Sequence, residues 1–162
     1  LTDCIKVLEM SFSGRNQTFN ATTLTNNGFY PNVSLGEFQK LHRVPSNIAD
    51  DAVENQVSLA MGAVNLALED TKAKAQWAAT EYANLAAIDA TDNGNRQRFY
   101  RAAVYYRAKA KLLKDFQTFN RRPVAENQAT ESDEIYKTLI AESRRAMNQL
   151  PGIATTINVE LL

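Results

Sequence analysis

Apolar residues recur at helical spacing along most of the chain, and the clearest case is the stretch from Asn95 to Arg122. At 100° per residue its apolar positions fall into two separate stripes, which predicts one long helix with two apolar faces. The first stripe contains Phe99, Ala102, Ala103, Tyr106, Ala110 and Leu113, and the second contains Tyr105, Ala108, Leu112, Phe116 and Phe119. Such a helix must be covered from both sides, either by more of its own chain or by another subunit. Tyr105, Phe116 and Phe119 are therefore candidate interface aromatics.

A second helix with two apolar faces is predicted from Ser46 onward. One face contains Val53, Val57, Ala60, Met61, Val64 and Leu68, and the other contains Ile48, Ala52, Leu59, Ala63 and Leu66. Because no residue from Lys72 to Ala86 breaks a helix, helical character is expected to about Ala87. The composition of 89–94 then predicts a turn.

Two further helices are predicted from capping signals. Ser34 and Glu37 have the spacing of a capping box, so a short helix is expected to about Arg43, before Pro45. Beyond Pro123, Thr130 followed by Asp133 can cap a fourth helix. Its apolar side contains Ile135, Tyr136, Leu139, Ile140, Met147 and Leu150, and Pro151-Gly152 terminates it.

The two ends of the chain lack helical spacing. Residues 11–33 are rich in Asn, Thr, Ser and Gly, which predicts an extended arm. The closing residues alternate and then end apolar, as in a short strand or docking tail, with Ile157, Val159, Leu161 and Leu162 as its docking residues. The predicted fold class is all-α: an extended arm over 1–33, a small bundle with long central helices over 34–150, and a C-terminal tail over 151–162.

Charge is balanced over the whole chain but segregated along it. The formal net charge is zero, yet 95–122 holds nine of the eighteen Lys and Arg residues against the single acid Asp115. Arg96, Arg107, Lys111 and Lys114 share one sector of the predicted helix. Residues 46–71 contain acids and no base, and Asp51, Glu54 and Glu69 are candidate acidic interface residues. Two uses of the basic sector stay open, namely contact with an acidic helix of a neighbouring subunit or contact with DNA phosphates.

Residues that could carry catalysis are sparse. His42 is the single histidine and Cys4 the single cysteine, so a disulfide within the chain, a cysteine-based metal site and a histidine triad are not expected. We predict no enzyme activity and no cofactor. The sequence also has no apolar run long enough to span a bilayer, so we expect a soluble intracellular protein without membrane contact. Met10 is a candidate natural start, which would make 1–9 an extension.

Three stretches resemble the head completion proteins of temperate contractile-tailed phages, the GPL family. They are NNGFYPNVSLGEFQKLHRVP at 26–45, RFYRAAVYYRAKAKLLKDFQTF at 98–119, and SRRAMNQLPGI at 143–153 followed by INVELL. The most specific pieces are Asn27 to Pro31, the run from Arg101 to Tyr106, and the ending from Val159 to Leu161. Their order and spacing carry the resemblance, which leaves the first 25 residues outside it.

The resemblance implies a structural virion protein without catalysis, found at the head-tail junction and assembled in the host cytoplasm. Such proteins resemble head-to-tail adaptors, which form a ring, here expected to be dodecameric, beneath the portal after DNA packaging. The implied partners are further copies of the chain, the portal protein, a tail terminator or another neck protein, and packaged DNA through nonspecific contact. The alternative function is that of a helical nucleic-acid-binding or regulatory protein, which would be a monomer or dimer with salt-sensitive DNA affinity.

Overall fold

The computed structural model describes residues 19–44, 48–70, 82–119 and 126–150. Within these ranges the chain forms five helices and one small antiparallel sheet, which confirms the predicted helical fold class. The strands are β1 (Thr23–Leu24) and β2 (Val33–Ser34). The helices are α1 (Leu35–His42), α2 (Asp50–Ala67), α4 (Leu85–Asp92), α5 (Arg96–Phe119) and α6 (Glu126–Asn148).

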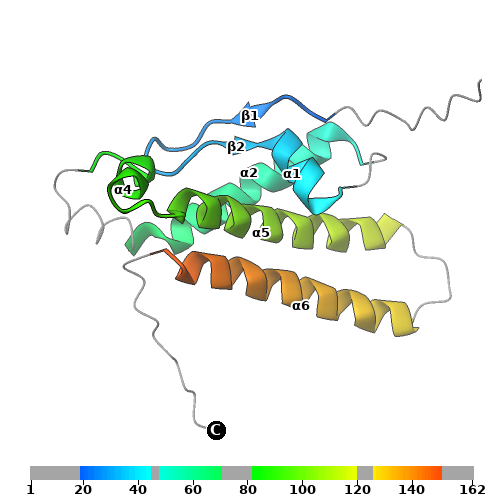
Figure 1. The fold of residues 1–162 in the computed structure, drawn as a ribbon. Coiled ribbons are helices and arrows are strands. Elements are labelled where there is room, and N and C mark those ends of the chain that lie inside the picture. The colour runs from blue at the N-terminus through cyan, green and yellow to red at the C-terminus, as the bar shows by residue number, and fades with distance from the viewer. Residues whose placement is uncertain (1–18, 45–47, 71–81, 120–125, 151–162) are drawn as a thin grey trace, which may run out of the picture.

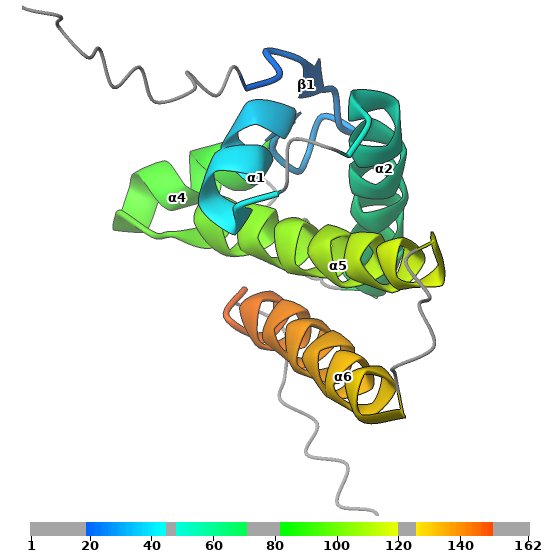
Figure 2. The same ribbon diagram turned by 90° about the vertical axis from the view of Figure 1, so that its right-hand side faces the viewer.

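Helix α5 is the centre of the molecule (Figure 1). Helix α6 runs along one side of it, while α1, α2 and the two-stranded sheet cover the other (Figure 2). A hydrogen bond joins α6 to α5: the fully buried Ser143 hydroxyl donates to the Ala103 carbonyl oxygen at 2.8 Å. On the opposite side, Tyr100, Val104 and Ala108 are fully buried. As far as the described side chains reach, the two apolar faces of this helix therefore pack against its own chain, which is one of the two arrangements expected from the sequence.

The sheet corrects the prediction of an arm without strand structure over 11–33, as far as the described residues reach. Thr23 pairs with Ser34, and Leu24 pairs with Val33. In the connecting turn, the Asn27 side-chain oxygen accepts hydrogen bonds from the Phe29 and Tyr30 amides at 3.1 and 3.2 Å. Both aromatic side chains are buried in the bundle core. The boundary drawn at residue 33 thus falls inside the packed structure.

Polar side chains join this turn to the two long helices. The side-chain nitrogen of Asn26 donates to the Tyr100 hydroxyl of α5 at 2.8 Å. The side-chain nitrogen of Asn65 on α2 donates to the side-chain oxygen of Asn26, also at 2.8 Å. The Tyr100 hydroxyl in turn donates to the Asn65 oxygen. The Tyr30 ring stacks on Tyr100 with centroids 4.7 Å apart. Burial raises the pKa of Tyr100 to about 12, so its hydroxyl stays protonated as a donor.

Helix α1 begins as predicted and ends at a left-handed residue. The Ser34 hydroxyl accepts a hydrogen bond from the Glu37 amide at 3.2 Å, which is the expected N-cap. The Glu37 carboxylate does not complete the predicted capping box, because it accepts a hydrogen bond from the Tyr105 hydroxyl of α5 at 2.9 Å. At the other end, Arg43 adopts φ 48°, a conformation that stops the helix.

The prediction that helical character continues from Ser46 to about Ala87 is wrong within the described residues, and 71–81 lies outside them. Helix α2 begins at Asp50 and ends at Ala67, and α4 begins separately after Asn84, whose extended backbone (φ −161°) interrupts any helix. The Asn84 side chain accepts a hydrogen bond from the Ala87 amide at 2.9 Å and so caps α4. The first four residues of the turn predicted over 89–94 are helical, because α4 continues to Asp92. The left-handed residue Asn93 then ends the helix.

Helix α6 starts earlier than its predicted cap. It begins at Glu126, so Thr130 lies within the helix rather than at its start. The Asp133 carboxylate lies 2.7 Å from the Lys137 ammonium, one turn further along the same helix. No helix breaker separates Glu126 from Thr130, so the helix extends past the capping signal.

Candidate assembly surfaces

The basic sector predicted on α5 is divided in the structure. Arg96 lies at the start of the helix, where its guanidinium is 3.3 Å from the Asp89 carboxylate of α4 and its side chain is 13% exposed. The same carboxylate accepts hydrogen bonds from the backbone amides of Arg96 and Gln97 at 3.0 and 2.9 Å. Asp89 therefore caps α5 from the preceding helix and holds Arg96 within the chain.

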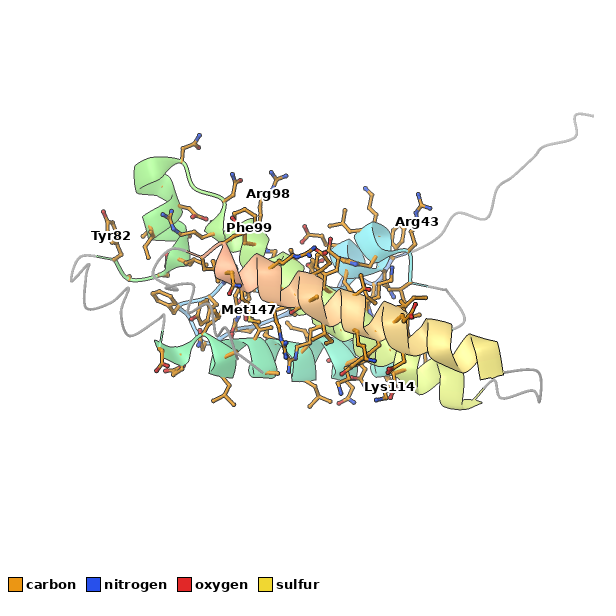
Figure 3. All side chains as sticks on the ribbon, turned by 90° about the horizontal axis from the view of Figure 1, so that it is seen from below. Arg43, Tyr82, Arg98, Phe99, Lys114 and Met147 are labelled. Carbon is orange, nitrogen blue, oxygen red and sulfur yellow. The ribbon has the colours of Figure 1, made fainter. Side chains whose placement is uncertain are left out.

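The remaining three bases of this sector lie beside α6. The ammonium groups of Lys111 and Lys114 lie 5.6 and 5.0 Å from the centre of the Tyr136 ring, a cation–π arrangement. Both lysine side chains are also exposed to solvent, whereas Arg107 is half-buried. Lys114 lies well away from Arg43 and Arg98, which share the opposite edge of the molecule (Figure 3). Lys114 on the one hand, and Arg43 and Arg98 on the other, thus lie on separate surfaces.

The three candidate interface aromatics do not form one exposed surface. Tyr105 is 2% exposed, and its hydroxyl donates to the Ser34 carbonyl oxygen at 3.1 Å as well as to Glu37. Its predicted place at a subunit interface is therefore corrected, because its ring belongs to the core of a single chain. The side chains of Phe116 and Phe119 lie outside the described residues, and so do the tail residues Ile157, Val159, Leu161 and Leu162.

The acidic residues of α2 are exposed. Asp51 and Glu54 reach solvent, as does Glu69 just beyond the end of the helix, and Asp50 accepts a hydrogen bond from the Gln39 side chain of α1 at 3.0 Å. Two large apolar side chains share this outer side of α2, since Leu59 is 60% and Leu66 is 78% exposed. Neither leucine was singled out as a functional residue from the sequence. The available signal was the second apolar face of the helix, which the described chain leaves open.

His42 lies among aromatic rings near the end of α1. Its ring centre is 5.5 Å from Phe38, 5.6 Å from Tyr105 and 5.1 Å from Tyr106. Burial, with a smaller effect from the nearby Lys109 charge, lowers the pKa of His42 to about 4. The imidazole is thus a neutral packing group near pH 7.

Metal binding and membrane crossing have no candidate within the described ranges. No group of three or more His, Cys, Asp or Glu side chains in that part of the chain is placed to hold a metal ion. None of the helices described there is both long enough and apolar enough to cross a bilayer.

The fold and its surfaces define a small helical protein whose distinctive feature is an open apolar and acidic helix face. The chain matches the family model described as phage head completion protein (GPL) over residues 24–162. It is also 31% identical over 142 residues to a protein of Haemophilus phage HP1 (strain HP1c1) named "Probable head completion/stabilization protein". That match covers 87% of this chain and 93% of the phage HP1 protein. No solved structure matches the chain.

This chain belongs to the phage head completion protein (GPL) family. The resemblance read from the sequence is therefore confirmed, and the protein has a structural role in the phage head as a component of the virion.

Proposed function

We propose that this protein is a head-to-tail adaptor that forms a dodecameric ring beneath the portal, closes the DNA-filled head and provides the platform to which the tail attaches. Membership of the head completion family is the observation that carries the proposal. Assembly takes place in the host cytoplasm, and the protein acts by contact rather than by catalysis. Its partners are further copies of itself, the portal protein above and a tail terminator or another neck protein below.

The open face of α2 supports an assembling subunit. Leu59 and Leu66 are both exposed on one side of this helix, and contiguous exposed apolar surface often marks contacts with other proteins. Ring formation requires a heterologous contact, in which one surface of each copy meets a different surface of the next. A chain with an acidic surface and separate basic surfaces suits such a contact, because opposite charges fix the order and register of the copies.

The basic residues beside α6 are proposed to face packaged DNA. Lys111 and Lys114 are exposed. Because the net charge of the chain is zero, a single copy as a whole is not strongly attracted to DNA. A ring that repeats these two lysines would nevertheless present a band of positive charge toward phosphates. This contact would be independent of base sequence and would weaken as salt concentration rises.

The C-terminal tail is proposed to dock on the portal by adding an extended segment to its backbone. We expect removal of 157–162 to leave a folded helical protein that no longer binds purified portal. Circular dichroism would check folding, and co-sedimentation with portal would check binding. A matched control replaces Asn158 and Glu160 with Ser, which keeps the apolar tail residues and should retain binding. Portal binding by the truncated chain would contradict the docking tail.

A further inference from the structure

The outer side of α2 is a continuous exposed strip. Leu59 and Leu66 are 60% and 78% exposed, and their spacing of seven residues places them on the same side of the helix, two turns apart. Small or polar residues complete the strip, and all of them are exposed: Ala52, Asn55 and Gly62. A Cβ atom built at Gly62 would meet nothing within 4 Å. The strip therefore has two protruding leucines separated by a low, accessible surface.

Acidic residues stand at both ends of this strip. Asp51 precedes the leucines, and Glu69 and Asp70 follow them, with all three exposed. No Lys, Arg or His occurs between 48 and 70, so nothing within α2 offsets the negative charge. A partner for this surface would combine an apolar centre with positive charge around it.

The opposite edge of the same molecule has that composition. Leu41 on α1 is 62% exposed and lies between the exposed Lys40 and Arg43. Arg98 on α5 is exposed along the same edge, as Figure 3 shows, whereas α2 forms the other edge. In Figure 2, α1 and α4 lie at the left and α2 at the right, although α1 and α2 both lie on the side of α5 away from α6.

We propose that the outer strip of α2 in one copy docks on the basic edge of a second copy, formed by Lys40, Leu41, Arg43 and Arg98. The inference rests on the proposed function, because it names the surfaces through which the ring would close. It also moves the basic half of the contact from the α5 sector to the edge beside α1. In the α5 sector, Arg96 is bound to Asp89, and the two lysines lie against Tyr136 of their own chain.

The location of the two surfaces decides the symmetry of the contact. Surfaces on opposite edges allow a head-to-tail arrangement, in which every copy uses both surfaces and the series closes into a ring. A symmetric pairing of two α2 strips would bury the leucines as well, but it would bring acidic helix ends together without any base from α2. Like charges across an interface disfavour such a pairing. The leucines supply the apolar burial, and the charges mainly set orientation and association rate.

Cysteine cross-linking in full-length protein tests the contact. In a Cys4→Ser background, one chain carries Leu66→Cys and a second chain, distinguished by a tag, carries Leu41→Cys. A short bismaleimide added at high protein concentration traps weak contacts between free copies. We expect the mixed covalent dimer to exceed either homodimer about tenfold, and to decline as salt screens the charges. A Leu66→Cys homodimer as abundant as the mixed product, or no mixed product, would overturn the proposal.

Two controls make the result specific to the surface. The first control uses Ile135 on α6, which is 45% exposed. The Ile135→Cys variant, mixed with Leu41→Cys, should give no more cross-linked product than random collision gives. The double variant Leu59→Ser, Leu66→Ser should fold normally, as judged by circular dichroism, and should fail to form ring-bearing particles in a phage that lacks the natural protein. If the mixed cross-link forms but the unaltered chain does not restore particles to the phage that lacks this protein, the proposed function is refuted and the contact stands. Normal particles from the double variant would refute the contact and leave the function standing.

Discussion

Single residues show which side-chain roles can be predicted from the sequence. Ser34 was predicted as a helix cap because a hydroxyl three residues before Glu37 is a local signal, and the structure has that bond. Tyr105 is predicted at an interface because the sequence shows the apolar stripe to which it belongs. The sequence does not show which elements of the same chain cover that stripe. Its hydroxyl reaches Ser34 and Glu37, which are 71 and 68 residues away in the chain. Long-range partners of this kind depend on the fold and have no local signature.

The environment of His42 makes stability depend on pH. The pKa of its imidazole is about 4 in the folded chain against 6.5 in the unfolded chain, so between these values the unfolded chain binds more protons. Stability should therefore fall as pH is lowered from 6.5 to 4, by on the order of 1 kcal/mol once partial solvent exposure is allowed for. The measurement is urea unfolding at several pH values for the unaltered protein and for His42→Gln. An identical pH dependence of both proteins would contradict this assignment.

At the scale of elements, the periodicity of apolar residues predicts long helices well, but it predicts the interruptions between helices poorly. The spacing of apolar residues identified α5 and the apolar side of α6, since both helices present several turns to the core. The break before α4 was missed because Asn84 caps a helix without any Pro or Gly to mark it. The sheet was missed because strands of two residues are too short to show alternation.

The junction between α4 and α5 is expected to depend on Asp89. Its side chain is 9% exposed, and its carboxylate binds two amides at the start of α5 as well as Arg96. Asp89→Ala removes the cap and leaves buried donors without an acceptor, which should cost about 2 kcal/mol of unfolding free energy. Asp89→Asn should cost less, because its amide oxygen can still accept one of these bonds. Urea denaturation measures both values.

A matched control for Asp89 comes from the exposed ion pair on α6. Asp133 lies beside Lys137 at the surface of the helix, and Asp133→Ala should leave the unfolding midpoint within experimental error. If Asp89→Ala were as mild as this control, the carboxylate would not hold the two helices together.

At the scale of the whole molecule, the sequence predicts more apolar helix surface than one small core covers. The structure divides this surplus into two parts. Within the described residues, α6 on one side and α1 and α2 on the other cover the two stripes of α5, whereas the second face of α2 keeps Leu59 and Leu66 exposed. Sequence periodicity alone could not distinguish the two cases, because both helices show two stripes. The exposed part is the surface that assembly with other copies would cover.

Imaging purified protein mixed with purified portal by electron microscopy tests the central claim most directly. We expect a ring of many copies on one end of the portal, with α2 of each copy turned toward its neighbour. The Leu59→Ser, Leu66→Ser variant should fail to form this ring. Portal particles without added density, or with isolated copies that do not touch one another, would contradict the account.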